Sequence, residues 1–469
     1  MKSLTAFAAV SALAFSAHPG LASRAHAADN PAGPQPSARP NILVLVADDL
    51  GYADISAQGA RPDIATPCID SLARNGVRFT AGYVTNPVCA PSRAALLTGR
   101  NQQRFGFEYN PGTEEEAPAN FGIPRGERLF SERLKALDYA TAAIGKWHVG
   151  YRPELQPRQR GFDTFYGHLN GAHHYMNNDD GLLQDNGSPL QKITYTTTLF
   201  GDYAVDFIRR HKAAPWGIYL AYSAVHGRIR APESYLRKFA HIADVKRRTL
   251  LAMMAAMDDS VGGILNALRE TGQLERTLVV FISDNGGLPS VNASLNTPFR
   301  GGKGELYEGG VRVPFLMQWP GVIPAGLVYD RPVSATDIVP TIMAAVGLPA
   351  DPRLDGVNLL PFLSGKKTGT PHETLCWRVK NSLGWTIRQG DWKLFSNQKN
   401  NPKTLELYHL ADDPGETTNL AEKQPGKVKE LRAAWHAWDK DNIEPLWGNR
   451  KKLGGKKKKA ARAGGGDAD

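Results

Sequence analysis

The sequence predicts an α/β protein, with a mostly parallel β-sheet between helices and a smaller α+β subdomain at its C-terminal end. Apolar runs of strand length alternate with helical stretches along most of the chain, which is typical of a parallel sheet covered on both faces. Towards the C-terminus, a stretch rich in Gly, Lys and Pro separates a helix from two short strands about a turn at Gly390. We therefore place the larger domain at residues 39–363 and the subdomain at residues 364–447.

The composition is that of a globular protein large enough to bury a sizeable core. Of 469 residues, 42% are hydrophobic and 22% are charged, and the net charge is +10. The segment from Arg450 to Asp469 contains eight Lys or Arg residues and two Asp residues, so it alone supplies +6 of that charge. The rest of the chain is only mildly basic, and we expect no nucleic-acid partner. Residues 448–469 are predicted to be a disordered basic tail, either a solvated end or a tether to a polyanion.

The N-terminal residues have the features of a secretory signal peptide. Lys2 precedes an apolar run from Leu4 to Ala17, and the small residues that follow end at Ala27. The run is too short to span a bilayer, so it favours a cleaved signal over a transmembrane segment, with a buried N-terminal helix as the alternative. We predict a signal peptide at residues 1–27, a linker at residues 28–38, and an exported protein that is periplasmic or secreted.

Four of the predicted strands, which begin near residues 41, 140, 216 and 277, each end in polar side chains. Taken singly, these side chains have ordinary explanations as turn, cap or solvated residues. In open α/β sheets, however, ligands bind beyond the carboxyl ends of the strands. We therefore predict that the four endings face one crevice, which would bring together Asp48, Asp49, Lys146, His148, His226, Asp284 and Asn285.

Part of this set predicts a metal site. Asp48, Asp49, Asp284 and Asn285 offer only oxygen ligands, which suits a hard cation such as Ca²⁺ or Mg²⁺ and does not suit Zn²⁺. A divalent ion would also offset the repulsion among three clustered carboxylates.

Cysteine usage points to a special role for Cys89. Three cysteines are an odd number and too few for a disulfide framework, and we expect Cys68 and Cys376 to be small buried side chains. Cys89 lies in the segment NPVCAPSRAALLTGR, where we expect it to be exposed just ahead of a helix that starts near Ser92, with Ser92 as the N-cap. The helix N-terminus and the Arg93 guanidinium would both favour an anion there.

The segment Cys-Ala-Pro-Ser-Arg, followed by Leu-Leu-Thr-Gly-Arg, resembles the signature of the formylglycine-dependent (type I) sulfatases of the alkaline phosphatase superfamily. The resemblance extends from residue 41 to about residue 420. Within the family, the sequence resembles arylsulfatases and polysaccharide sulfatases of the N-acetylgalactosamine-6-sulfatase kind. It implies an alkaline-phosphatase-like fold and a sulfuric ester hydrolase. The other segments that carry it, in chain order, are NILVLVADDLGYAD, GKWHVG, RGFDTFYG, ISDNGG, RGGKGELYEGGVRVPFLMQWPG, ATDIVPTIMAAVGLP and ELYHLADDPGETTNLA.

The resemblance also implies a nucleophile and a metal. In this family a dedicated maturation enzyme oxidises the signature cysteine to formylglycine, whose hydrated form attacks the sulfur of a sulfate monoester. Carried over to this chain, Cys89 would become that nucleophile. Together with Asp48, Asp49, Asp284 and Asn285 it would bind the cation, which we expect to be Ca²⁺ rather than Mg²⁺.

The remaining polar residues take roles in substrate binding and proton transfer by the same resemblance. His226 and Lys303 would protonate the departing oxygen, and His148 would remove the proton whose loss regenerates the aldehyde. Lys146 and Arg93 would hold the sulfate oxygens.

A polar loop after the RGFDTFYG segment suggests contacts with a sulfated sugar. His173 and His174 are predicted to hydrogen-bond sugar hydroxyls, and Tyr175 to offer an aromatic face. Arg228 and Arg230 are expected to meet a neighbouring acidic group, although loop His and Arg residues are often merely solvated. Arg228 also stands where the family often has proline, so the shape of its loop is left open.

Two other functions remain open on the sequence. A phosphate or phosphonate monoester hydrolase on the same fold would share the acidic cluster but would not need Cys89 to become an aldehyde. A non-catalytic protein that binds sulfated glycans would keep the pocket and show no turnover.

Overall fold

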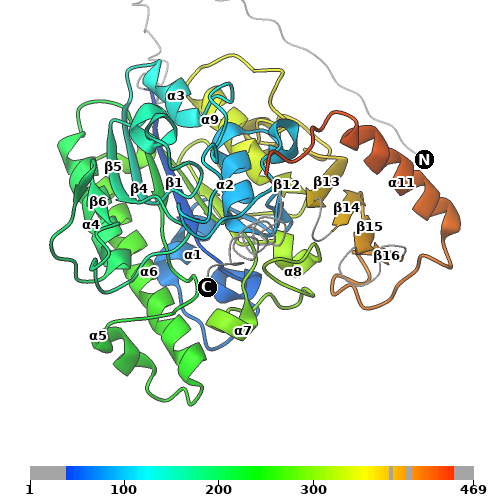
Figure 1. The fold of residues 1–469 in the computed structure, drawn as a ribbon, viewed down its shortest axis with the longest axis horizontal. Helices are drawn as coiled ribbons and strands as arrows, with labels where there is room; N and C mark the ends of the chain where they lie inside the picture. The colour runs from blue at the N-terminus through cyan, green and yellow to red at the C-terminus, as the bar shows by residue number, and fades with distance from the viewer. Residues whose placement is uncertain (1–38, 380–383, 398–403, 448–469) are drawn as a thin grey trace, which may run out of the picture. The chain divides into compact units, whose positions relative to one another are not determined.

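The computed structural model describes residues 39–379, 384–397 and 404–447, and the predicted signal peptide, linker and basic tail lie outside these residues. In the described part, a ten-stranded sheet has helices on both faces, and a separate four-stranded antiparallel sheet lies towards the C-terminus (Figure 1). The predicted fold class, a mostly parallel α/β sheet followed by an α+β subdomain, is confirmed.

The strands at the middle of the large sheet are parallel. β9, β1, β8 and β4 are neighbours in this order and run in one direction, and β5 continues the parallel run, whereas β10 is antiparallel to β9. The order across the sheet is β11 (Leu327–Tyr329), β2 (Val77–Phe79), β10 (Phe315–Gln318), β9 (Thr277–Ser283), β1 (Asn41–Ala47), β8 (Trp216–Ala221), β4 (Ala140–Lys146), β5 (Thr164–His168), β6 (Gln184–Asp185) and β7 (Ser188–Pro189).

The alternation of side chains along β1 explains why both faces of the sheet are covered. All seven residues of β1 are buried. Ile42, Val44 and Val46 pack into an apolar cluster with α2, α3 and α9. Leu43 and Leu45 point to the other face and pack into a second cluster with α1, α4 and α6. Figure 1 shows these two sets of helices on opposite sides of the strands.

The helices differ widely in length, and in the part of the chain that is described none is long and apolar enough to cross a membrane. They are α1 (Pro67–Arg74), α2 (Cys89–Thr98), α3 (Phe130–Lys135), α4 (Thr196–Arg210), α5 (Glu233–Leu236), α6 (Val245–Glu270), α7 (Pro289–Asn292), α8 (Glu308–Val311), α9 (Ile338–Ala345), α10 (Leu360–Leu363) and α11 (Pro425–Asp439).

The C-terminal sheet is a meander of four antiparallel strands. Its two strands about Gly390 are β14 and β15, as expected, and they lie outside the large sheet. One side of the meander packs against α11, where the rings of Trp385 and Trp435 stack with centroids 4.3 Å apart. Trp377 joins the core of the larger domain instead, so the two parts share apolar contacts. The strands are β13 (Thr374–Val379), β14 (Gly384–Gln389), β15 (Trp392–Asn397) and β16 (Leu405–His409).

Candidate active site

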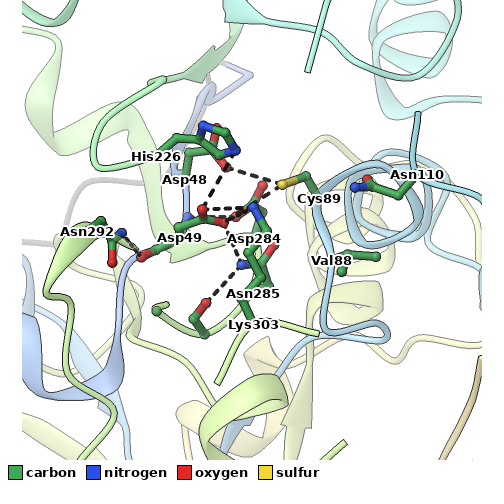
Figure 2. A network of polar contacts seen from close by, with 12 residues as sticks. Asp48, Asp49, Val88, Cys89, Asn110, His226, Asp284, Asn285, Asn292 and Lys303 are labelled. Carbon is green, nitrogen blue, oxygen red and sulfur yellow. Dashed lines mark hydrogen bonds and ion pairs between the residues drawn. The ribbon is translucent and has the colours of Figure 1, made fainter. Parts of the chain in front are cut away.

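The four strand endings converge at one edge of the sheet. Because β9, β1, β8 and β4 are parallel neighbours, the residues that follow them emerge side by side. Lys146 Nζ lies 2.7 Å from Asp48 Oδ2, and the backbone N–H of Asp49 donates to Asp284 Oδ1 at 3.2 Å. His226 Nε2 lies 3.8 Å from Asp49 Oδ2. Figure 2 shows the side chains of Asp48, Asp49 and Asp284 close together, with Cys89 facing them.

Each of the three buried carboxylates has a cationic partner. Besides the pair of Asp48 with Lys146, Lys303 Nζ lies 2.7 Å from Asp49 Oδ1, and Arg93 places Nε and Nη2 at 2.8 and 2.7 Å from Asp284 Oδ2. The Arg93 guanidinium also reaches within 3.7 Å of Asp48 Oδ1. Isolated charges are very unfavourable in a protein interior, so this pairing with cations helps three carboxyl groups to be buried together.

Cys89 faces this cluster from the first turn of α2. Its thiol lies 3.4 Å from Asp48 Oδ1 and 3.9 Å from Asp49 Oδ1. The expected exposure of Cys89 was wrong, since only 1% of the residue is accessible. Burial, outweighing the nearby Lys146 and Lys303, raises the pKa of the thiol well above its ordinary value, so the unmodified side chain is neutral.

The predicted start of this helix is also wrong. α2 begins at Cys89, so Ser92 lies buried inside the first turn and is not the N-cap. Val88 occupies the cap position and has no side chain that could accept a hydrogen bond. Instead, Asn110 Oδ1 accepts the backbone N–H of Ala90 at 2.8 Å, so a distant loop satisfies a donor that a local cap would have taken.

The same loop orients His148. Its Nε2 lies 2.5 Å from the carbonyl oxygen of Pro111, so Nε2 must carry the proton that it donates there. Nδ1 is then the unprotonated nitrogen, and it is buried with no hydrogen-bond partner in the described chain. Burial, followed by the charge of Lys146, lowers the pKa of His148 well below its ordinary value. The ring packs so closely on Gly171 that a Cβ there would come within 2.7 Å of it. His148 is therefore a fixed, neutral base.

His226 and Lys303 differ in protonation. Burial lowers the pKa of His226 even though Asp48 and Asp49 oppose that shift. For Lys303, burial favours the neutral amine, but the charge of the paired Asp49 carboxylate outweighs burial and raises the pKa above the ordinary value. At neutral pH Lys303 thus holds a proton that it could donate, whereas His226 is mostly neutral.

The acidic residues fit a hard cation. Asp48, Asp49 and Asp284 are at most 2% exposed, and Asn285 Oδ1 is buried with no hydrogen-bond donor in the described residues. Asp48, Asp49, Cys89 and His226 can each offer one ligand atom within 4.8 Å of the others. The three carboxylates are balanced by Arg93, Lys146 and Lys303, so a divalent ion would make the pocket net positive and favour an anionic substrate.

Asn292 is a buried residue of this site that no sequence pattern indicated. Its amide donates to the carbonyl oxygens of Asp49 at 3.2 Å and Val225 at 2.8 Å, and so joins the loop that carries Asp49 to the loop that carries His226 (Figure 2). Asn292 follows Asp49 by more than two hundred residues, so only the folded chain reveals this link.

The C-terminal subdomain holds both ends of the segment that carries Lys303. At one end, Arg300 Nη1 donates to the carbonyl oxygen of Glu416 at 2.9 Å and to the Tyr408 hydroxyl at 3.1 Å. At the other end, the backbone N–H of Glu308 donates to Glu416 Oε2 at 2.6 Å. Lys393 Nζ lies 2.9 Å from Glu308 Oε1 and 2.8 Å from Glu416 Oε1, and all three side chains are fully buried.

We expect Glu416→Gln to weaken the pH dependence of stability. Burial raises the pKa of Glu416 to about 7 although Lys393 opposes the shift. Above its ordinary pKa and below pH 7, the folded state keeps a proton that the unfolded chain has released, so this group lowers stability as pH rises through that window. Between pH 5 and pH 8 the variant should lose less unfolding free energy than the wild type, by about 1 to 3 kcal/mol.

Urea unfolding at the two pH values measures this difference. The exposed Glu422→Gln makes the same chemical change outside the buried cluster and should follow the wild type. An equal loss of stability in Glu416→Gln and the wild type would contradict the assignment.

The predicted sugar-contact residues gather beside His226. His173, His174, Tyr175, Arg228 and Arg230 line one cavity of about 490 Å³. The ring of His173 is nevertheless engaged by the protein, with Nδ1 2.7 Å from the His174 carbonyl oxygen and Nε2 3.1 Å from Asp180 Oδ1. Tyr175 is buried and donates its hydroxyl to backbone carbonyl groups, so it has little aromatic face to offer.

The fold and the pocket of paired acids and cations define an enzyme of the alkaline phosphatase superfamily. Residues 40–348 match the sulfatase family profile, and residues 302–437 match that of the N-sulphoglucosamine sulphohydrolase C-terminal region. The chain belongs to the sulfatase family, and it is a sulfuric ester hydrolase.

Individual relatives agree with this placement. The chain is 33% identical over 442 residues to the N-acetylgalactosamine-6-sulfatase of Sus scrofa, covering 83% of this chain and 82% of that protein. A crystal structure of Ps i-CgsB in complex with k-i-k-neocarrahexaose superposes with a TM-score of 0.82 and 34% identity, covering 90% of this chain and 98% of that one. A phosphonate monoester hydrolase of Agrobacterium radiobacter, with a TM-score of 0.64 and 20% identity over 86% of this chain and 96% of that one, shares the fold alone.

Proposed function

We propose that this chain hydrolyses sulfate monoesters of a sulfated carbohydrate, with a formylglycine made from Cys89 as the nucleophile and a bound Ca²⁺. The observation that carries the proposal is the position of Cys89: its sulfur faces Asp48 at 3.4 Å and Asp49 at 3.9 Å, in a buried pocket with three paired cations. A thiol in this place would serve neither a disulfide nor an apolar core.

Asp48, Asp49, Asp284 and Asn285 would hold the Ca²⁺, with the modified Cys89 as a further ligand. Their oxygen atoms and the unpartnered amide oxygen of Asn285 suit this ion. When bound, it would draw electron density from the sulfate oxygens and favour the ionised nucleophile.

The remaining side chains would position the sulfate and move protons. Arg93 pairs with Asp284, and Lys146 pairs with Asp48. Each cation would use its remaining N–H groups to donate hydrogen bonds to the sulfate oxygens. Lys303 Nζ holds its proton at neutral pH and would donate a hydrogen bond to the departing sugar oxygen, but its raised pKa makes it a weak acid. His226, whose pKa burial lowers, would be the stronger acid when protonated and would transfer the proton to that oxygen. His148 Nδ1, unprotonated and unpartnered, would take the proton whose removal restores the aldehyde.

A carbohydrate substrate is supported by two relatives, one named for the 6-sulfate of N-acetylgalactosamine and one crystallised with a neocarrahexaose. Beside the site, His174 and Arg228 line a cavity that would receive the sugar, and His173 would shape its wall. We further propose export after cleavage near Ala27 and modification of Cys89 by a maturation enzyme of the formylglycine-generating kind.

A phosphate or phosphonate monoester hydrolase is less well supported, because the relative of that activity shares only the fold and because Cys89 lies in the position of the nucleophile. A purely glycan-binding role would leave His148 and Lys303 without a use.

Peptide mass spectrometry of the exported protein tests the proposal. The peptide that contains Cys89 should be about 18 Da lighter than its unmodified mass, as conversion of a thiol to an aldehyde requires, and the preparation should release sulfate from 4-nitrophenyl sulfate. The same digest should contain an N-terminal peptide that begins near Ala28. An unmodified Cys89 in a preparation with full sulfatase activity would refute the role of formylglycine.

A further inference from the structure

A cationic cavity adjoins the proposed sulfate site. It has a volume of about 490 Å³, and Arg228, Arg230 and Lys246 line it together with no acidic residue. The two arginines come from the loop after β8, and Lys246 comes from the first turn of α6.

The walls of this cavity are continuous with the catalytic pocket. Tyr175, which lines the cavity, donates its hydroxyl to the carbonyl oxygens of Ser223 at 2.5 Å and His226 at 3.1 Å. Val291, also in the lining, directly precedes Asn292, whose amide holds the carbonyl oxygen of Asp49 at 3.2 Å. A sugar whose sulfate reached Asp49 and His226 would therefore extend its next residue towards the cavity.

Within the described part of the chain, the cationic groups of the cavity have no ion-pair partner. In the described residues, the guanidinium groups of Arg228 and Arg230 make no hydrogen bond or ion pair, and both side chains belong to exposed residues. Lys246 Nζ makes one hydrogen bond, to the carbonyl oxygen of Ser290 at 3.0 Å. The nearby Asp244 carboxylate is already engaged, since it accepts the backbone N–H groups of Lys246 and Arg247 at the start of α6. Three cations in one concave surface without a carboxylate partner favour an anionic ligand.

We propose that this cavity binds a second anionic group of the substrate, a sulfate ester or a carboxylate on the sugar next to the one that loses its sulfate. The inference rests on the proposed function, because it places the cleaved sulfate at Cys89. The planar forks of Arg228 and Arg230 match the paired oxygens of either group, and Lys246 adds a point charge. The enzyme is therefore selective for glycans that carry charge on adjacent sugars.

Steady-state kinetics on the matured, metal-loaded protein tests this selectivity. Four substrates are compared: 4-nitrophenyl sulfate, a disaccharide with one cleavable sulfate and a neutral neighbour, and the same disaccharide with either a sulfate or a carboxylate on that neighbour. We expect kcat/KM to be about tenfold or more higher for at least one doubly charged disaccharide than for the singly charged one. The doubly charged disaccharide with the higher kcat/KM identifies whether the cavity binds a sulfate or a carboxylate.

The double variant Arg230→Gln/Lys246→Gln should remove most of this preference, bringing the ratio of the two kcat/KM values to within about twofold of unity. Arg237→Gln is the matched control, because Arg237 is an exposed cation that does not line the cavity, and it should keep the wild-type ratio. The preference of the wild type should also shrink as salt rises from about 0.05 to 0.5 M, since exposed charges are screened. This measurement needs no variant.

The outcomes separate the two proposals. If the matured protein turns over 4-nitrophenyl sulfate and does not distinguish the disaccharides, the cavity proposal is wrong and the proposed function stands. If neither the aryl sulfate nor any disaccharide is hydrolysed, the proposed function itself fails. A preference that persists in the double variant, or that is independent of salt, also contradicts the assignment to this cavity.

Discussion

Cys89→Ala is expected to abolish sulfate release while the protein stays folded. The substitution removes the atom from which the proposed nucleophile is made, so kcat/KM on 4-nitrophenyl sulfate should fall by at least about 10⁴-fold. Stability should change by no more than about 1 kcal/mol, because the buried thiol faces the charged atoms of Asp48 and Asp49 and contributes little apolar packing.

The control is Cys376→Ala, which makes the same chemical change at another buried cysteine. Cys376 packs in the apolar cluster between the C-terminal sheet and α11, so we expect this variant to keep its activity and to lose some stability. Both kcat/KM and the midpoint of urea unfolding are measured for each variant. Turnover by Cys89→Ala at the wild-type rate would exclude Cys89 as the nucleophile.

Asp284→Ala should impair ion binding, activity and stability together. It removes one of the anionic ligands proposed for Ca²⁺, and we expect calorimetric titration of the chelator-treated protein to show a loss of affinity of at least about 100-fold. It also leaves the Arg93 guanidinium without the carboxylate that lies 2.7 Å from it in the interior. Removing one partner of a buried ion pair costs about 3 to 5 kcal/mol of unfolding free energy.

A second aspartate separates these two effects. Asp351 pairs with the buried Arg133 at 2.8 Å and lies outside the proposed metal site. Asp351→Ala should therefore lower stability and leave the affinity for Ca²⁺ unchanged. If Asp284→Ala binds Ca²⁺ as tightly as the wild type, or if the chelator-treated wild type keeps full activity, the proposed metal site is wrong.

The sequence by itself determined the class of fold and the direction in which to look for the site. The apolar runs that become β1, β4, β8 and β9 are continuous because parallel strands are buried on both faces, and polar residues lie at or soon after the end of each strand. Since parallel strands end at one edge, the convergence of their last residues follows from the pattern alone. The signature around Cys89 pointed to the family that the comparisons then established.

Only the tertiary structure decided how the polar groups are paired and which of them are free. Arg93 forms an ion pair with Asp284, and Asn292 donates a hydrogen bond to the carbonyl oxygen of Asp49. Glu416 accepts a hydrogen bond from the end of the segment that carries Lys303. Each of these contacts joins residues more than one hundred positions apart along the chain. The first turn of the helix that carries Cys89 likewise involves a residue from another segment, because Asn110 accepts the backbone N–H of Ala90. A local pattern reports propensities within a few residues, whereas ion pairs, burial and the protonation of buried groups depend on what distant segments bring into contact. The cavity of Arg228, Arg230 and Lys246 is of the same kind, because two separate segments supply its charge.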